Sequence, residues 1–327
     1  MPRSLLLPLA TCAVLLLALS GCSAGGGEQS AASGDPDPAG AFPVTLDHAF
    51  GSTTVEKRPE RVVAIGYNEA DFVMALGVQP VAEREFIGDF DWQKRAWLPQ
   101  RPLGPTPQVL DATTLPVEQV AALEPDLILG VYSFLDRSTY DRLSQIAPTV
   151  AQPTEDGTNA ATWDEQTRIT GQALGRTEQA EQVITETRRT FDEAKQAHPD
   201  FAGRALTMAF FIDGTPYDLG TDDLRAQLFA GLGFDVRPDT QELSLEQQGQ
   251  LDGDVVAVMG RTRAEAEADP VFSAIPAVRE GRVVYLGDFT TEFAGALGYS
   301  SPLSLPYAID TVAPQLDAAL KGRPQGT

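Results

Sequence analysis

The longest uninterrupted helical pattern outside the apolar N-terminus runs from Arg176 to Pro199. Small or apolar residues recur there at steps of three, four or seven and form one stripe on a helix of 3.6 residues per turn. The stripe consists of Ala180, Val183, Ile184, Thr187, Phe191 and Ala194. Thr177 can cap its start, and Pro199 ends it because proline disfavours helical geometry in the preceding residue. We expect a helix from Glu178 to Ala197, about 30 Å long.

Two pairs of similar segments flank this helix. Residues 117–129 (VEQVAALEPDLIL) and 245–257 (LEQQGQLDGDVVA) each read as a short helix, a tight turn, an aspartate and an apolar strand. Residues 68–78 and 222–236 also resemble each other, each with a helix that ends at a glycine. Strands that alternate with helices predict parallel sheets. We therefore expect an α/β fold in which two Rossmann-like lobes with parallel sheets are joined by one long α-helix, with a ligand cleft between them. The alternative is a single domain with an ordinary surface helix.

The remaining elements are assigned from the same patterns. Strands are expected at 44–46, 53–55, 61–65, 78–82, 127–129, 149–151, 205–212, 255–259 and 282–286. Helices are expected from a cap at Asn68 to Gly77, and at 117–123, 139–146, 163–174, 222–232, 245–249 and 302–320, with 84–107 irregular. This divides the folded chain into an N-terminal lobe (42–175), the connecting helix (176–199) and a C-terminal lobe (200–327).

The N-terminal residues are typical of an export signal. The apolar run at 5–19 is too short for a comfortable membrane span. The tetrapeptide Leu-Ser-Gly-Cys that ends at Cys22 resembles a bacterial lipobox, in which the cysteine is lipidated and becomes the new N-terminus. We expect a lipoprotein signal peptide at 1–21, a lipid on Cys22 and a flexible tether at 22–41. The alternative is a plain signal peptide cleaved nearby, with Cys22 incidental.

Composition and missing motifs argue against several functions. Forty-six acidic residues face twenty-four basic ones, and the net charge is −22. Such a chain is not expected to bind nucleic acid or an anionic membrane surface. Without a P-loop, G-x-S-x-G or H-E-x-x-H motif, we expect neither an enzyme nor a cofactor. His48 and His198 are the only imidazoles, so a zinc or haem site of the usual ligands is not expected.

Several short motifs resemble the iron–siderophore substrate-binding proteins of ABC importers. They are DHAFG (47–51), PERVV (59–63), GYNEA (66–70), ALGVQPV (75–81), LEPDLILG (123–130) and IAPTV (146–150). The likeness extends over about residues 44–314. It implies the helical-backbone class of periplasmic binding proteins, class III, with two α/β lobes and one connecting helix.

The resemblance also implies a function. A member would capture a ferric siderophore and deliver it to an ABC permease for iron uptake. It would be a monomer, anchored by its N-terminal lipid on the extracytoplasmic face of the cell membrane, and its iron would be held by the siderophore alone. The same architecture could instead carry cobalamin, haem or a bare metal ion, or serve as a surface sensor without transport. The scarcity of histidine disfavours metal and haem.

Ligands of open parallel sheets bind beyond the carboxyl ends of the strands, where this sequence is rich in aromatic residues and arginines. The candidate ligand-binding residues are Tyr67, Arg84, Trp92, Trp97, Tyr132, Tyr217, Arg261, Arg263, Phe289 and Tyr299, with Phe86 and Phe134 beside them. Aromatic rings would pack against the exterior of a ferric siderophore, and Arg84, Arg261 and Arg263 would supply positive charge to an anionic one. For each residue alone, the alternative is core packing for an aromatic ring and a solvated position for an arginine.

Three acidic residues are candidates for docking to the permease. In the resembling family, a glutamate at the start of the first-lobe helix and an acidic residue of the second lobe pair with permease arginines. Glu69 matches the first position, whereas Asp222 and Asp223 lie near the second without matching it. The alternative for all three is a favourable charge at a helix N-terminus.

Overall fold

The structure is a computed structural model of the chain. It describes residues 41–86, 88, 90–154 and 161–322, which belong to one compact unit that extends over residues 37–327. The predicted signal peptide, Cys22 and all but the last residue of the predicted tether lie outside the described residues. Within the described part of the chain, no helix has the length and apolar character that a membrane span requires.

The first lobe is built on a five-stranded sheet in the order β5-β4-β3-β6-β7, in which all neighbours run parallel. Its strands are β3 Val62–Ala64, β4 Ala82–Arg84, β5 Gln108–Leu110, β6 Leu127–Leu129 and β7 Thr149–Val150. Its helices are α1 Glu69–Ala75, η1 Trp92–Lys94, α2 Val117–Ala122, α3 Arg137–Ser144 and α4 Trp163–Ala173. The predicted hairpin is also present, as antiparallel strands β1 Val44–His48 and β2 Gly51–Val55.

Two local expectations for the first lobe are wrong. The strand expected at 78–82 begins only at Ala82, because the Val78 amide bonds back to the Val73 carbonyl of α1 and Pro80 has no amide proton for a sheet. Asn68 precedes α1 but makes no capping bond. Its side-chain amide instead donates to the carbonyl oxygen of Tyr299 in the second lobe, at 3.0 Å.

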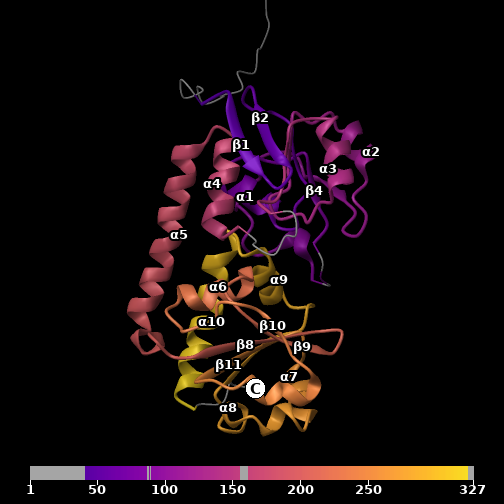
Figure 1. Cartoon of the computed structure of the whole chain (residues 1–327). Helices are drawn as coiled ribbons and strands as arrows, with labels where there is room; N and C mark the ends of the chain where they lie inside the picture. The colour runs from indigo at the N-terminus through magenta and orange to yellow at the C-terminus, as the bar shows by residue number, and fades with distance from the viewer. Residues whose placement is uncertain (1–40, 87, 89, 155–160, 323–327) are drawn as a thin grey trace, which may run out of the picture. The chain divides into compact units, whose positions relative to one another are not determined.

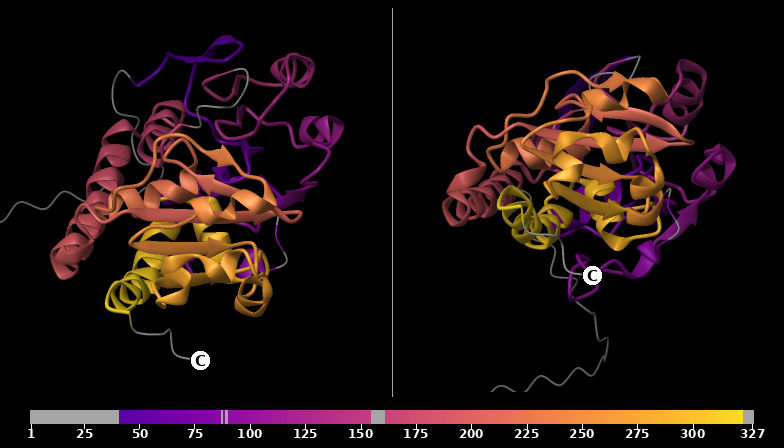
Figure 2. Two further views of the ribbon diagram at one scale, coloured as in Figure 1. Left: turned by 60° about the horizontal axis from the view of Figure 1, so that its bottom comes forward. Right: turned by 90° about the horizontal axis from the view of Figure 1, so that it is seen from below.

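The second lobe is built on a five-stranded sheet in the order β10-β9-β8-β11-β12. Its strands are β8 Leu206–Ile212, β9 Thr215–Leu219, β10 Gln241–Glu242, β11 Val255–Met259 and β12 Val283–Gly287. Its helices are η2 Pro199–Phe201, α6 Leu224–Gly231, η3 Leu245–Gln250, α7 Arg263–Ala268, η4 Phe272–Ala274, α8 Pro276–Arg279, α9 Glu292–Tyr299 and α10 Ser304–Leu320. They cover both faces of the sheet (Figure 2).

This second sheet is mixed, whereas the sequence pattern predicts a parallel one. Strands β8, β11 and β12 are parallel, but β9 runs antiparallel to β8, and β10 antiparallel to β9. The cause is a tight turn at Asp213-Gly214, where both residues have positive φ (50° and 80°). A two-residue Asp-Gly loop is a strong hairpin signal, because both central residues of a type I′ turn need positive φ. Tyr217, which is expected beyond the end of a strand, lies within β9.

The predicted connecting helix is confirmed as α5, Thr177–Ala197. Its buried stripe contributes to both lobes, because Ala180 packs in a core cluster of the first lobe and Phe191 in the main core of the second. Trp163 of α4 stacks on Phe191, with ring centroids 6.3 Å apart. The helix runs along the side of both lobes (Figure 1) and contacts α4 in the first and α10 in the second.

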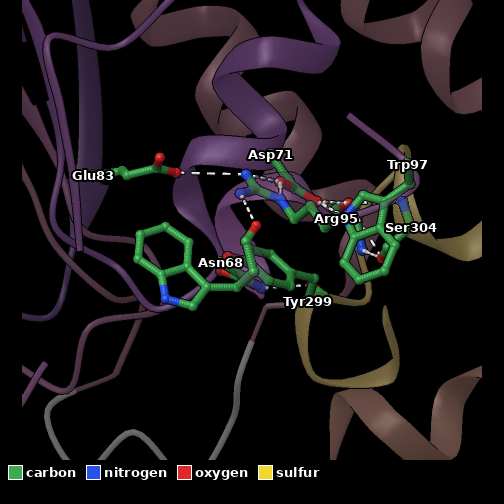
Figure 3. Close-up of polar contacts among 9 residues, drawn as sticks. Asn68, Asp71, Glu83, Arg95, Trp97, Tyr299 and Ser304 are labelled. Carbon is green, nitrogen blue, oxygen red and sulfur yellow. Dashed lines mark hydrogen bonds and ion pairs between the residues drawn. The ribbon is translucent and has the colours of Figure 1, made fainter. Parts of the chain in front are cut away.

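A second connection between the lobes is centred on the buried carboxylate of Asp71 in α1 (Figure 3). Its Oδ1 accepts from the Nε and Nη2 of Arg95, at 3.0 and 2.7 Å. Its Oδ2 accepts from the Trp97 indole and from the hydroxyl of Ser301 in the second lobe, both at 2.8 Å. We call Asp71, Arg95, Trp97 and Ser301 the Asp71 network. Its hydrogen bonds fix the segment around Trp97 against both α1 and the second lobe.

We expect Asp71→Ala to lower the free energy of unfolding by about 3–5 kcal/mol, because it leaves the buried guanidinium of Arg95 without its main partner. Asp91→Ala is the matched control. Asp91 lies close to Arg95 and Trp97 in the chain, but it forms an exposed ion pair with Lys94. Denaturant unfolding of both variants measures the difference. Equal unfolding midpoints for the two variants would contradict a structural role for the network.

Candidate ligand-binding site

Four first-lobe residues at or beyond the carboxyl ends of strands form one cluster: Tyr67, Arg84, Tyr132 and Phe134. The guanidinium of Arg84 lies over the Tyr67 ring, 4.0 Å from its centroid. The Phe134 ring is 6.2 Å from that of Tyr67 and 5.0 Å from that of Tyr132, centroid to centroid. Phe134 is 51% exposed and has a positive φ of 53°. The cluster thus presents apolar ring surface beside a cation.

Arg84 is buried and is held by backbone carbonyls. Its Nε and Nη2 donate to the carbonyl oxygen of Ala112, at 3.1 and 2.7 Å, and its Nη1 to those of Ile65 and Ser133, both at 3.4 Å. Burial lowers its pKa, although the phenol of Tyr67 and the carboxylate of Asp111 raise it. Among the described residues, no carboxylate forms an ion pair with it within 4.0 Å. Its positive charge therefore remains available to a ligand.

The second lobe contributes a matching set around Phe210, a buried residue of β8 that belongs to the main core of this lobe. Arg225 of α6 lies over the Phe210 ring at 4.2 Å, and the rings of Phe289 and Tyr217 lie 5.6 and 6.5 Å from it. Arg225 is paired with Asp223, the residue that caps α6, through a 2.8 Å bond from its Nε. We did not predict Phe210 or Arg225 from the sequence.

These two sets approach each other at Tyr132. Burial raises the pKa of the Tyr132 phenol, the Asp223 carboxylate raises it further, and Arg225 lowers it. Phe289 also lies beside the first lobe, because a Cβ on Gly88 would come within 3.1 Å of its carbonyl oxygen. The aromatic rings and arginines of both lobes therefore gather in one region, which we call the interlobe site. Its residues are Tyr67, Arg84, Tyr132, Phe134, Phe210, Tyr217, Arg225 and Phe289.

Glu69 is not placed to dock a permease, because its side chain is completely buried. Its carboxylate accepts the backbone N–H groups of Val131 and Tyr132, at 2.9 and 3.2 Å. Gly66 makes room for it, since a Cβ there would lie 1.7 Å from Glu69 Oε2. Burial raises the pKa of Glu69 to about 7, although the two amides act to lower it. Glu69 therefore fixes the turn that carries Tyr132.

Five other candidates lie outside the interlobe site. Trp92, Trp97 and Tyr299 are buried, and the Tyr299 ring packs in the contact between the lobes, with Phe86 stacked on it at 4.5 Å. Arg261 and Arg263 lie at α7, on the opposite face of the second sheet. Arg261 stacks on Phe211 and pairs with Asp269 at 3.0 Å, while Arg263 pairs with Glu267 at 2.8 Å. The sequence does not reveal on which face of the sheet each side chain falls.

The two candidate docking aspartates differ in environment. Asp222 is exposed, and its carboxylate accepts from the amide and hydroxyl of Thr240. Asp223 is partly buried and engaged with Arg225. A docking role for either residue stays a prediction. Among the described residues, no group of three or more His, Cys, Asp or Glu side chains could hold a metal ion.

Comparison with known proteins gives a family match over residues 62–289, to the model described as periplasmic binding protein. Among curated proteins, the chain is 28% identical over 213 residues to a Bacillus subtilis protein named as the probable siderophore-binding lipoprotein YfiY. That match covers 63% of this chain and 62% of the relative, so it spans less than two thirds of the relative's length.

Two solved structures share the fold over most of the chain. A periplasmic solute binding protein from Mycobacterium smegmatis is 32% identical, with a TM-score of 0.75, and the match covers 85% of this chain and 98% of that one. The PiaA protein of Streptococcus pneumoniae, in complex with ferrichrome, is 26% identical, with a TM-score of 0.76 and coverage of 85% and 99%. The similarity thus includes both lobes and the connecting helix.

Glu69 predicts how stability depends on pH. Its pKa is about 7 in the folded protein and 4.5 ordinarily, so the folded chain holds a proton that the unfolded chain has released between these values. The stability that this group contributes is complete below about pH 4.5 and is lost as the pH rises through about 7. We expect Glu69→Gln, which cannot ionise, to gain up to about 3 kcal/mol in unfolding free energy relative to the unmodified protein across this window. Chemical denaturation at several pH values measures this, and a pH-independent difference would contradict the raised pKa.

Proposed function

Because the chain belongs to the periplasmic binding protein family, we propose that it captures a ferric siderophore and delivers it to an ABC permease for iron uptake. The family assignment makes it a binding protein rather than an enzyme. The observation that carries the ligand proposal is the interlobe site. There the guanidinium of Arg84, which forms no ion pair with a carboxylate of the described residues, lies over the Tyr67 ring, and the rings of Tyr132 and Phe134 lie beside it. The relatives support this proposal, since the Bacillus subtilis protein is named as a probable siderophore-binding lipoprotein and the PiaA structure contains ferrichrome.

The chemistry of the site suits such a ligand. A ferric siderophore encloses its iron in oxygen donors and presents an aryl or alkyl exterior. The rings of Tyr67, Tyr132 and Phe134 would pack against that exterior, and Phe289 would meet it from the second lobe, where it packs against the buried ring of Phe210. Arg84 would donate hydrogen bonds to the oxygen atoms around the iron or stack on a ring. Iron would be held by the siderophore without a direct ligand from the protein.

We expect Arg84→Ala to weaken binding of a ferric siderophore by about tenfold or more, because it removes a buried charge-assisted donor from the site. Arg261→Ala is the matched control, since Arg261 is paired with Asp269 on the other face of the second sheet. Quenching of intrinsic tryptophan fluorescence on titration with a panel of ferric siderophores gives both affinities. An unchanged affinity for Arg84→Ala, or an equal loss in both variants, would contradict this site.

The N-terminal assignments complete the proposal. Residues 1–21 would serve as signal peptide and 22–41 as tether, ahead of a lobe at 42–175, a connecting helix at 176–199 and a lobe at 200–327. Cys22 would carry the lipid that holds the protein, as a monomer, on the extracytoplasmic face of the cell membrane. The name of the Bacillus subtilis relative as a lipoprotein supports this.

Lipidation is tested by expressing the full chain and its Cys22→Ala variant in a bacterium. We expect the unmodified protein in the membrane fraction, with a lipid mass on Cys22, and the variant in the soluble extracytoplasmic fraction. If Cys22 carries no lipid, or if neither the unmodified protein nor the variant is cleaved, the lipid anchor is excluded.

A further inference from the structure

The interlobe site has little excess positive charge, although it contains two arginines. Arg225 is neutralised by Asp223, which accepts from its Nε at 2.8 Å and from its Nη2 at 2.5 Å. Among the described residues of the site, Arg84 is the remaining cation, and Asp111 is close enough to act on its charge. Arg261 and Arg263, which would have added two further charges, are paired on the opposite face of the sheet.

Carboxylates also approach the second-lobe wall. The hydroxyl of Tyr217 donates to Glu242 Oε2 at 3.3 Å, and Asp213 acts on the same phenol. Beneath the first-lobe wall, Glu69 adds a further negative charge whenever it is ionised. Among these described groups, Arg84 and Arg225 carry two positive charges, whereas Asp111, Asp213, Asp223 and Glu242 carry four negative ones. The region therefore has no excess of positive charge, within a chain whose net charge is −22.

The charge of a ferric siderophore depends on its iron-binding groups. Three hydroxamates each carry one negative charge and together cancel the charge of Fe³⁺, so that the complex is neutral. Three catecholates each carry two negative charges, so that their complex with Fe³⁺ is a trianion. Moving a trianion out of water and into a partly buried site requires compensating cations, since an uncompensated charge is strongly penalised there.

We propose that the interlobe site selects ferric complexes without net negative charge, as formed by three hydroxamates, over trianionic triscatecholates. This inference rests on the proposed function and specifies the ligand class of the same site. Arg84 meets the oxygen atoms of one hydroxamate, and the aromatic walls cover the rest of an uncharged surface. Asp223 is the specificity-determining residue, because it cancels the second cation that a trianionic ligand would need.

The test compares two probes on the full chain, ferrichrome as a neutral trihydroxamate and ferric enterobactin as a trianionic triscatecholate, by tryptophan quenching. We expect the unmodified protein to bind ferrichrome at least about tenfold more tightly. Asp223→Asn keeps a residue that can cap α6 but frees the charge of Arg225. It should raise the affinity for the triscatecholate relative to that for the trihydroxamate about fivefold or more.

Asp239→Asn is the matched control. It removes the same charge from an exposed aspartate of the second lobe whose backbone packs against Gly220, close to the start of α6. We expect it to change neither affinity by more than about twofold, because exposed charges are screened by solvent and salt. The expected gain for Asp223→Asn should also shrink as the ionic strength rises.

The outcomes separate the two proposals. Tighter binding of the triscatecholate than of the trihydroxamate by the unmodified protein would overturn the charge selection and leave the proposed function intact. Equal effects of Asp223→Asn and Asp239→Asn would overturn the role of Asp223. If neither ferric complex quenches the unmodified protein, the proposed function fails and the charge selection falls with it.

Discussion

The buried carboxylate of Asp71 is the interaction on which the relation between the lobes depends. A carboxylate taken out of water is costly unless its lone pairs are filled, and here Arg95, Trp97 and Ser301 fill them. Those donors come from a long first-lobe segment and from the second lobe, so satisfying one charge also joins separate parts of the chain. Together with α5, which packs in the cores of both lobes, the network gives the lobes two connections of different kinds.

The walls of the interlobe site are positioned by buried polar groups beneath them. Glu69 accepts two amides of the turn that carries Tyr132, and Arg84 donates to the carbonyl of Ser133 in the same turn. Gln152 reinforces that turn through the amide and carbonyl of Leu135. Because each of these groups is buried, losing one contact leaves a partner unsatisfied, which makes the turn resistant to displacement. The aromatic residues exposed there can thus present a fixed surface to a ligand.

Much of the site could be foreseen, and the exceptions have identifiable causes. Tyr67, Arg84, Tyr132 and Phe289 follow strands whose ends are clear from local apolar runs, and the structure brings them together. Arg225 and Phe210 were missed because they lie inside α6 and β8, whereas the candidates were sought beyond the carboxyl ends of strands. The Asp213-Gly214 signal was present in the sequence and would have exposed the hairpin of β8 and β9. Glu69 was misassigned because a carboxylate at the start of a helix is expected to be exposed. Its partners, the amides of Val131 and Tyr132, lie 62 and 63 residues further along the chain, where no local pattern reveals them.

By itself, the sequence determined the connecting helix, the two lobes that it joins and many of their helices and strands, but not strands β5, β9 and β10 or helices α7, α8 and α9. These features follow from local periodicity, from glycine and proline at element ends and from the similarity of the two halves. Only the tertiary structure decided which side chains share a surface. Arg84 and Arg261 both follow or end a strand, yet Arg84 lies over Tyr67 in the first-lobe cluster, whereas Arg261 stacks on Phe211 and pairs with Asp269 on the other face of the second sheet. The difference lies in the packing of sheet faces against distant helices, an interaction whose partners no local pattern specifies.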